Sequence, residues 1–171
     1  MKTSVRWLLI FLILFSVVAL FTTHDFANGE GNKSNQEDLA ADFILKDTGG
    51  KTVKLSDYMG KTIFLYFMAT WCPECRGSIP KIKEIYSVYA PKGLVLLTVD
   101  VMESREKVAA FSKKYDIPFP MLLDEDGKVY REYGVGGVPV KALIDKTGRI
   151  ICWNCRSFDS LLTKQFEGKA K

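Results

Sequence analysis

The feature that most constrains the fold is an apolar run that leads directly into a cysteine pair. Residues 62–70 (TIFLYFMAT) are almost continuously apolar, as a central strand buried on both faces requires. The segment WCPEC comes next, and apolar residues then recur at intervals of three and four over 79–89 until APKG interrupts them at 90–93. The pattern therefore predicts a strand followed by a helix, with Cys72 at their junction.

Strand and helix patterns continue to alternate along the rest of the chain. Residues 94–101 (LVLLTVDV) predict a second buried strand, and helical spacing follows to about Tyr115. The remaining expected elements are a short strand at 121–124, a helix at 128–133, an antiparallel hairpin formed by VKALID and RIICW, and a final amphipathic helix from about 158. This order predicts an α/β domain with a mixed central sheet and helices on both faces.

The first 23 residues have the composition of a membrane-targeting segment. Lys2 and Arg6 precede an uncharged, apolar run at 7–21, which is short for a hydrocarbon core about 30 Å thick. No good small-x-small cleavage site follows, which favours an uncleaved signal-anchor over a removed signal peptide. In either case the positive charges before the run place the rest of the chain outside the cytoplasm. We expect a single-pass cell-membrane protein facing the periplasm or cell exterior, or a secreted or periplasmic protein if the segment is removed.

The composition after this segment predicts a tether and then one folded domain. Residues 24–38 are rich in Gly, Asn and acidic residues and offer little to bury, so we expect a flexible tether there. Residues 39–168 are enough for one core. The net charge is only +4 in 171 residues, and no dense basic stripe marks a nucleic-acid binder.

The position of Cys72 and Cys75 points to thiol-disulfide chemistry. Free amides and the positive end of the helix dipole at a helix N-terminus stabilise a thiolate on the first cysteine. The second cysteine, one turn later, can then attack a mixed disulfide formed on the first. A structural disulfide with this spacing closes a very small loop, and a zinc site lacks ligands because the single histidine, His24, lies in the tether. We expect a redox couple at Cys72 and Cys75, with no metal and no cofactor.

Residues on both sides of the motif resemble a known family. FMATWCPECRGSIP resembles the active-site strand and helix of thioredoxin-fold proteins, and its arrangement is similar to the TlpA/ResA-like thiol-disulfide oxidoreductases. ADFILKDTGGKTVKLSDYMGKTIFLYF resembles that family's N-terminal hairpin extension, of the AhpC/TSA/Redoxin type, and YGVGGVPVKALIDKTGRI resembles its cis-proline loop and closing hairpin. The resemblance implies a thioredoxin-like fold in which Pro139 is a cis-proline facing Cys72, while Trp71 and Val138 contact the substrate.

The resemblance also implies a function and its partners. It implies a membrane-tethered enzyme that reduces disulfides in partner proteins, apocytochrome c before haem attachment being the leading candidate, and that receives electrons from a membrane thiol reductase. A general envelope disulfide reductase is a close alternative. A peroxiredoxin-like antioxidant and a thiol-based metal-binding module remain further alternatives.

One departure from the family concerns proton transfer. Many members carry a buried acid on the strand or three residues after the second cysteine, but Tyr66 and Ser78 stand at these positions here. Glu74, between the cysteines, is expected to be exposed and to raise the thiol pKa values by like charge. The group that handles the proton of Cys75 is left open between Glu74 and water.

A second CxxC, CWNC at 152–155, lies near the end of the chain. Residues three apart on a strand face opposite sides, so a disulfide between Cys152 and Cys155 requires the strand to end by Trp153 or Asn154. A structural disulfide, an auxiliary redox pair, a metal site and two inert thiols are the alternatives. A covalent haem site is disfavoured because Arg156, not histidine, follows Cys155.

Overall fold

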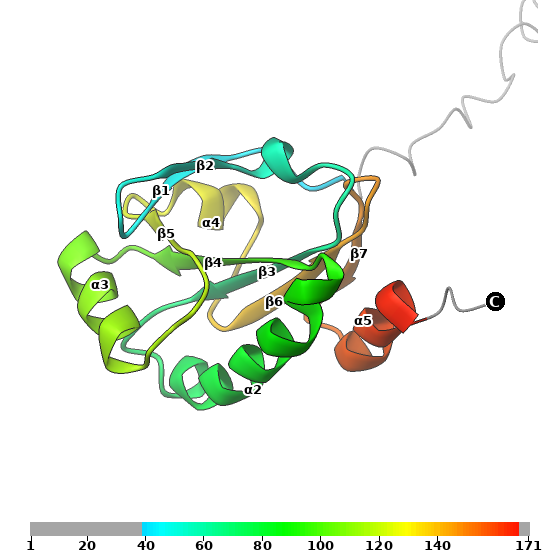
Figure 1. Ribbon diagram of the computed structural model, residues 1–171. Coiled ribbons are helices and arrows are strands. Elements are labelled where there is room, and N and C mark those ends of the chain that lie inside the picture. The colour runs from blue at the N-terminus through cyan, green and yellow to red at the C-terminus, as the bar shows by residue number, and fades with distance from the viewer. Residues whose placement is uncertain (1–38, 168–171) are drawn as a thin grey trace, which may run out of the picture. The chain divides into compact units, whose positions relative to one another are not determined.

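The apolar run that precedes the cysteine pair forms the central strand of the sheet. The computed structural model describes residues 39–167, which contain a seven-stranded sheet in the order β2-β1-β5-β4-β3-β6-β7 (Figure 1). The strands are β1 (Ile44–Asp47), β2 (Thr52–Lys54), β3 (Ile63–Met68), β4 (Val95–Val101), β5 (Met121–Asp124), β6 (Val140–Ile144) and β7 (Ile150–Trp153). β3, β4 and β5 are parallel, while β6 is antiparallel to β3 and β7 to β6. The predicted mixed sheet and closing hairpin are confirmed.

Two apolar layers hold helices against the two faces of the sheet. The helices are α2 (Pro73–Tyr89), α3 (Arg105–Lys114), α4 (Lys128–Glu132) and α5 (Phe158–Glu167), with short 3-10 turns η1 (Leu55–Tyr58) and η2 (Ala90–Lys92). Even-numbered β3 residues such as Phe64 and Tyr66 pack in one cluster with side chains from α2, α3 and α5. Odd-numbered ones such as Leu65 and Phe67 pack with η1 and α4. Every β3 side chain is therefore buried, which explains its continuous apolar sequence.

The N-terminal extension is a hairpin that lengthens the sheet. β1 pairs antiparallel with β2 on one side and with β5 on the other. Leu39 forms an isolated bridge with Arg149, next to the turn between β6 and β7. The described chain therefore starts at the end of the sheet opposite the end where β3 runs into α2.

The predicted membrane segment at 1–23 and tether at 24–38 lie outside the described residues. Within residues 39–167, no helix has the length and apolarity needed to cross a membrane.

Candidate active site

Cys72 stands where β3 gives way to α2. It is the N-cap of the helix in extended conformation, and Pro73 occupies the first turn, where a missing amide proton leaves no bond unmade. The Cys72 amide donates to the Ala69 carbonyl over 3.1 Å, and the Cys75 amide donates to the Cys72 sulfur over 3.2 Å. The helix N-terminus thus directs an amide at Sγ of Cys72, the arrangement that stabilises a thiolate there.

The loop before β6 faces this sulfur from the other side. The Val138–Pro139 peptide bond is cis, and the Cys72 thiol donates to the Val138 carbonyl over 3.6 Å. β6 follows directly and pairs with β3, which brings the loop and the cysteine together although 66 residues separate them. Trp71 is 65% exposed beside them, whereas Cys72 is 5% exposed. Trp71 and the Val138–Pro139 loop, which the sequence predicts to contact the substrate, therefore lie beside the Cys72 sulfur.

Cys75 lies deeper than Cys72 and is fully buried. Burial is the main reason that its pKa rises to about 12, and the hydrogen bond with Cys72 adds to the rise. Glu74 is exposed, as expected, and it is not among the causes of this shift. At neutral pH Cys75 is therefore a protonated thiol that must lose its proton before it attacks a mixed disulfide.

Tyr66 is the side chain next to Cys75. The sequence alone indicated only that it replaces an acid that many family members carry at this position. Its hydroxyl is buried and makes no hydrogen bond of standard geometry with the described residues. Burial first, and then the charge of Cys75, raise the pKa of Tyr66, while Ser78 acts in the opposite direction. The nearby Tyr66 hydroxyl in turn lowers the pKa of Cys75, as the last of the causes that act on that thiol. A neutral phenol thus stands where the family resemblance places a buried acid, and it can donate to the Cys75 thiolate but cannot accept its proton.

Replacing Tyr66 by phenylalanine should slow the second half of the exchange. The Tyr66→Phe variant keeps the ring and loses the donor to Cys75, and a hydrogen bond to an ionised group is worth about 1.5 kcal/mol or more, or about tenfold in rate. A single-turnover assay that follows loss of thionitrobenzoate from a mixed disulfide on Cys72 measures this step. The control is Cys152→Ser/Cys155→Ser, which leaves Tyr66 and Cys75 in place. Equal rates for Tyr66→Phe and wild type would show that the phenol has no part in the step.

The turn that leads to Cys72 is held from two sides. The Thr70 amide and hydroxyl both donate to Glu103, the hydroxyl over 2.7 Å. Arg76 donates to the carbonyls of Thr70 and Trp71, each over 3.3 Å. Sequence reasoning did not identify Glu103, which lies in the loop after β4 and meets Thr70 only through the pairing of β3 with β4.

The second CxxC forms a disulfide between Cys152 and Cys155. β7 ends at Trp153, and Asn154 takes a left-handed conformation with φ of 51°, which turns Cys155 back toward Cys152. Cys152 is buried opposite Leu143 of β6, and Cys155 is partly exposed. The bond lies at the edge strand, two strands away from β3, beside α5. Within residues 39–167, no three His, Cys, Asp or Glu side chains are placed to hold a metal ion.

Removing this second disulfide should affect stability and leave disulfide exchange intact. Chain entropy for so small a loop predicts a loss of about 2 kcal/mol in the Cys152→Ser/Cys155→Ser variant. Urea unfolding measures the loss, and insulin reduction measures the activity. A stable double variant that had lost most of its activity would instead point to an auxiliary redox pair.

A mixed sheet of this topology, with CxxC at the start of a helix and a cis-proline beside it, defines a thioredoxin-like thiol-disulfide oxidoreductase. Comparison with known proteins agrees with this class. The sequence model of the AhpC/TSA family matches residues 37–152, so the chain belongs to the AhpC/TSA family.

Individual relatives and one solved structure are similar to the chain over most of its length. The chain is 35% identical over 150 residues to "Thiol-disulfide oxidoreductase ResA" of Geobacillus thermodenitrificans, covering 88% of this chain and 83% of the relative. It is 33% identical over 150 residues to the protein of the same name from Bacillus cereus, covering 88% and 87%. A putative thiol:disulfide interchange protein DsbE from Chlorobium tepidum superposes with a TM-score of 0.68 at 30% identity, covering 77% of this chain and 94% of that structure.

Proposed function

We propose that this protein is a membrane-anchored, extracytoplasmic reductase of disulfides in partner proteins. The observation that carries the direction of the reaction is the buried Cys75, whose pKa is raised to about 12 by burial. A site that stabilises its thiolates strongly is an oxidant, because its reduced form is favoured. Burial of Cys75 has the opposite effect, because it disfavours the thiolate and so makes the reduced form less stable. A reduced form that is less stable gives up its electrons more readily, as a reductase requires.

The reaction consists of two exchanges at one pair of sulfurs. The Cys72 thiolate attacks one sulfur of the partner disulfide, the partner S–S bond breaks, and the other partner sulfur leaves as a thiolate. Cys75, once deprotonated, attacks Sγ of Cys72, which releases the second partner sulfur and forms the Cys72–Cys75 disulfide. Two electrons move to the partner, and its two thiolates take up protons from water. A membrane thiol reductase would return the pair to the dithiol state.

The partner is recognised mainly through its backbone. The Val138 carbonyl already accepts a hydrogen bond from Cys72, and beside it the exposed Trp71 offers an apolar surface. Main-chain contacts of this kind accept many sequences. The CxxC segment of apocytochrome c is the leading substrate candidate, because the resemblance to the TlpA/ResA-like oxidoreductases implies it. General reduction of envelope proteins is the second candidate, and the open, backbone-directed surface favours it.

Loss of covalent haem in cells that lack the protein tests the leading substrate. We expect c-type cytochromes, measured by haem-stained gels, to fall strongly in a deletion strain and to return with wild type but not with Cys72→Ala. The Cys152→Ser/Cys155→Ser variant serves as a control that keeps Cys72 and Cys75. Normal cytochrome content in the deletion strain, together with oxidised envelope proteins, would favour the general reductase. Rapid peroxide consumption by the purified protein, or a stoichiometric metal on its thiols, would overturn both.

A further inference from the structure

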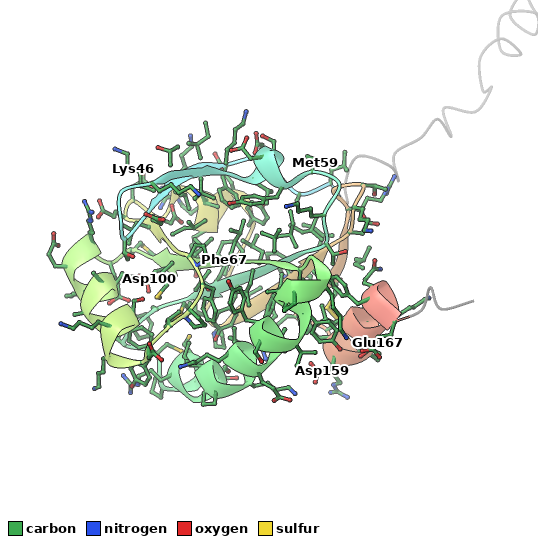
Figure 2. All side chains as sticks on the ribbon, viewed as in Figure 1. Lys46, Met59, Phe67, Asp100, Asp159 and Glu167 are labelled. Atoms are coloured by element: carbon green, nitrogen blue, oxygen red, sulfur yellow. A yellow bond between two sulfur atoms is a disulfide. The ribbon has the colours of Figure 1, made fainter. Side chains whose placement is uncertain are left out.

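Two buried carboxyl groups lie at the end of β4, behind the turn that leads to Cys72. Asp100 is fully buried and Glu103 is 7% exposed. Figure 2 shows Asp100 in the interior near the end of β4 that faces α3. Carboxylates are rarely buried without a cation or several hydrogen-bond donors, so this pair requires an explanation.

No donor within residues 39–167 serves Asp100. Neither of its oxygens receives a hydrogen bond from an N–H or O–H group there. Its strand neighbours are Met68 on β3 and Leu123 on β5, which carry no charge. Asp124 lies on the other face, where the amides of Val129 and Tyr130 bind its carboxylate. The charged side chains of α3, which covers the face where Asp100 lies, are exposed, namely Arg105, Glu106, Lys107, Lys113 and Lys114.

Glu103 is the carboxyl group whose charge acts on Asp100, and its own oxygens are bonded by Thr70. It accepts the two hydrogen bonds from Thr70, and Thr70 with Trp71 is in turn bound by Arg76. An ionised carboxylate accepts hydrogen bonds and donates none. Two adjacent carboxyl groups without another donor can stay buried together only if one of them keeps a proton. Because Glu103 acts as acceptor toward Thr70, that proton belongs to Asp100.

We propose that Asp100 is a protonated positioning residue: its carboxylic acid donates to Glu103, and the pair fixes the Ala69–Cys72 turn that presents the Cys72 sulfur to a partner. The pKa of Asp100 agrees with this assignment, since burial first and the charge of Glu103 second raise it to about 8. Loss of the proton would place two anions behind the turn. They would repel each other, loosen the hold on Thr70 and disfavour the Cys72 thiolate.

The reactivity of Cys72 tests the role of Asp100 without any protein partner. In a Cys75→Ser background, carbamidomethylation of the Cys72 peptide is followed by mass spectrometry between pH 5 and pH 10. The Asp100→Asn variant keeps a donor to Glu103 and cannot ionise, so its rate at pH 7 should stay within about twofold of the parent. It should lack the change in reactivity that the parent shows near pH 8. Asp100→Leu removes the Asp100 donor and leaves Glu103 only the two hydrogen bonds from Thr70, so the rate should fall about tenfold.

Infrared spectroscopy detects the proton on the Asp100 carboxyl group directly. The carbonyl stretch of a buried protonated carboxyl should be present at pH 6 in wild type, vanish as the pH rises past about 8, and be absent from Asp100→Asn. Asp124→Asn, a matched substitution on the other face of the sheet, should retain it. The proposal is overturned if the band is missing from wild type, or if Asp100→Asn reproduces the parent pH profile. The inference rests on the proposed function only in the role that it gives to the Ala69–Cys72 turn, because both measurements work without a substrate. A wild-type protein that shows the expected band but reduces no disulfide would overturn the proposed function and leave this inference intact.

Discussion

Cells that produce the Cys75→Ser variant should accumulate this protein joined covalently to its partner. Cys72, which is 5% exposed, keeps its place beside the exposed Trp71 and the Val138–Pro139 loop, so the first exchange proceeds. The fully buried thiol that would break the mixed disulfide is absent. The expected result is a band of higher mass on a non-reducing gel that disappears on reduction, and mass spectrometry of that band identifies the partner.

The matched controls separate trapping from non-specific oxidation. Cys72→Ser/Cys75→Ser should give no adduct, and Cys75→Ser combined with Cys152→Ser and Cys155→Ser should give the same adduct as Cys75→Ser alone. An adduct that persists without Cys72 would place the reactive sulfur in the second pair. Full disulfide-reducing activity in Cys72→Ala would contradict the mechanism altogether.

The free energy of unfolding should fall as the pH rises from about 4 to about 8, and Asp100 should cause a large part of that fall. In the unfolded chain its carboxyl group ionises near its ordinary pKa of 3.8, whereas in the folded protein burial and Glu103 raise the pKa to about 8. Between these values the folded state holds a proton that the unfolded state has released, so raising the pH favours unfolding. Below this window both states are protonated, and above it both are ionised.

Asp100→Asn removes this titration and keeps the shape of the side chain. We expect the variant to match or fall slightly below wild type near pH 4 and to exceed it by a few kcal/mol near pH 8, measured by urea unfolding across the range. Asp124→Asn is the control, since Asp124 is equally buried but is bound by two backbone amides. That variant should lose stability near neutral pH. Parallel curves for wild type and Asp100→Asn would show that Asp100 does not carry an extra proton in the folded state.

Local patterns in the sequence predicted the catalytic junction and most of the fold. The apolar run at 62–70 and the spacing at 79–89 predicted β3 and α2, and with them the position of Cys72. A disulfide between Cys152 and Cys155 required the last strand to end by Trp153 or Asn154. β7 does end at Trp153, and the disulfide forms. These features depend on neighbours within a few residues, which a sequence displays directly.

Contacts between residues on different strands could not be predicted from these local patterns. Glu103 and Thr70 are 33 residues apart, and only the register of β3 with β4 brings them together. The signal that could have been noticed is Asp100 itself, a charged residue within the apolar strand pattern LVLLTVDV. The closeness of Tyr66 to Cys75 was hidden for another reason. Tyr66 meets Cys75 only because α2 packs on the face of β3 to which Tyr66 points, and a sequence does not display that packing.

The bridge between Leu39 and Arg149 fixes the start of the described chain at one end of the sheet, and Cys72 lies at the other end. β3 starts near the β6–β7 turn, where Ala40 donates to the Gly148 carbonyl, and it runs about 20 Å before it reaches the turn that carries Cys72. Any force or attachment acting through the residues before Leu39 is therefore applied at the far side of the sheet. A partner protein can therefore engage Cys72 without meeting the edge at which the described chain begins.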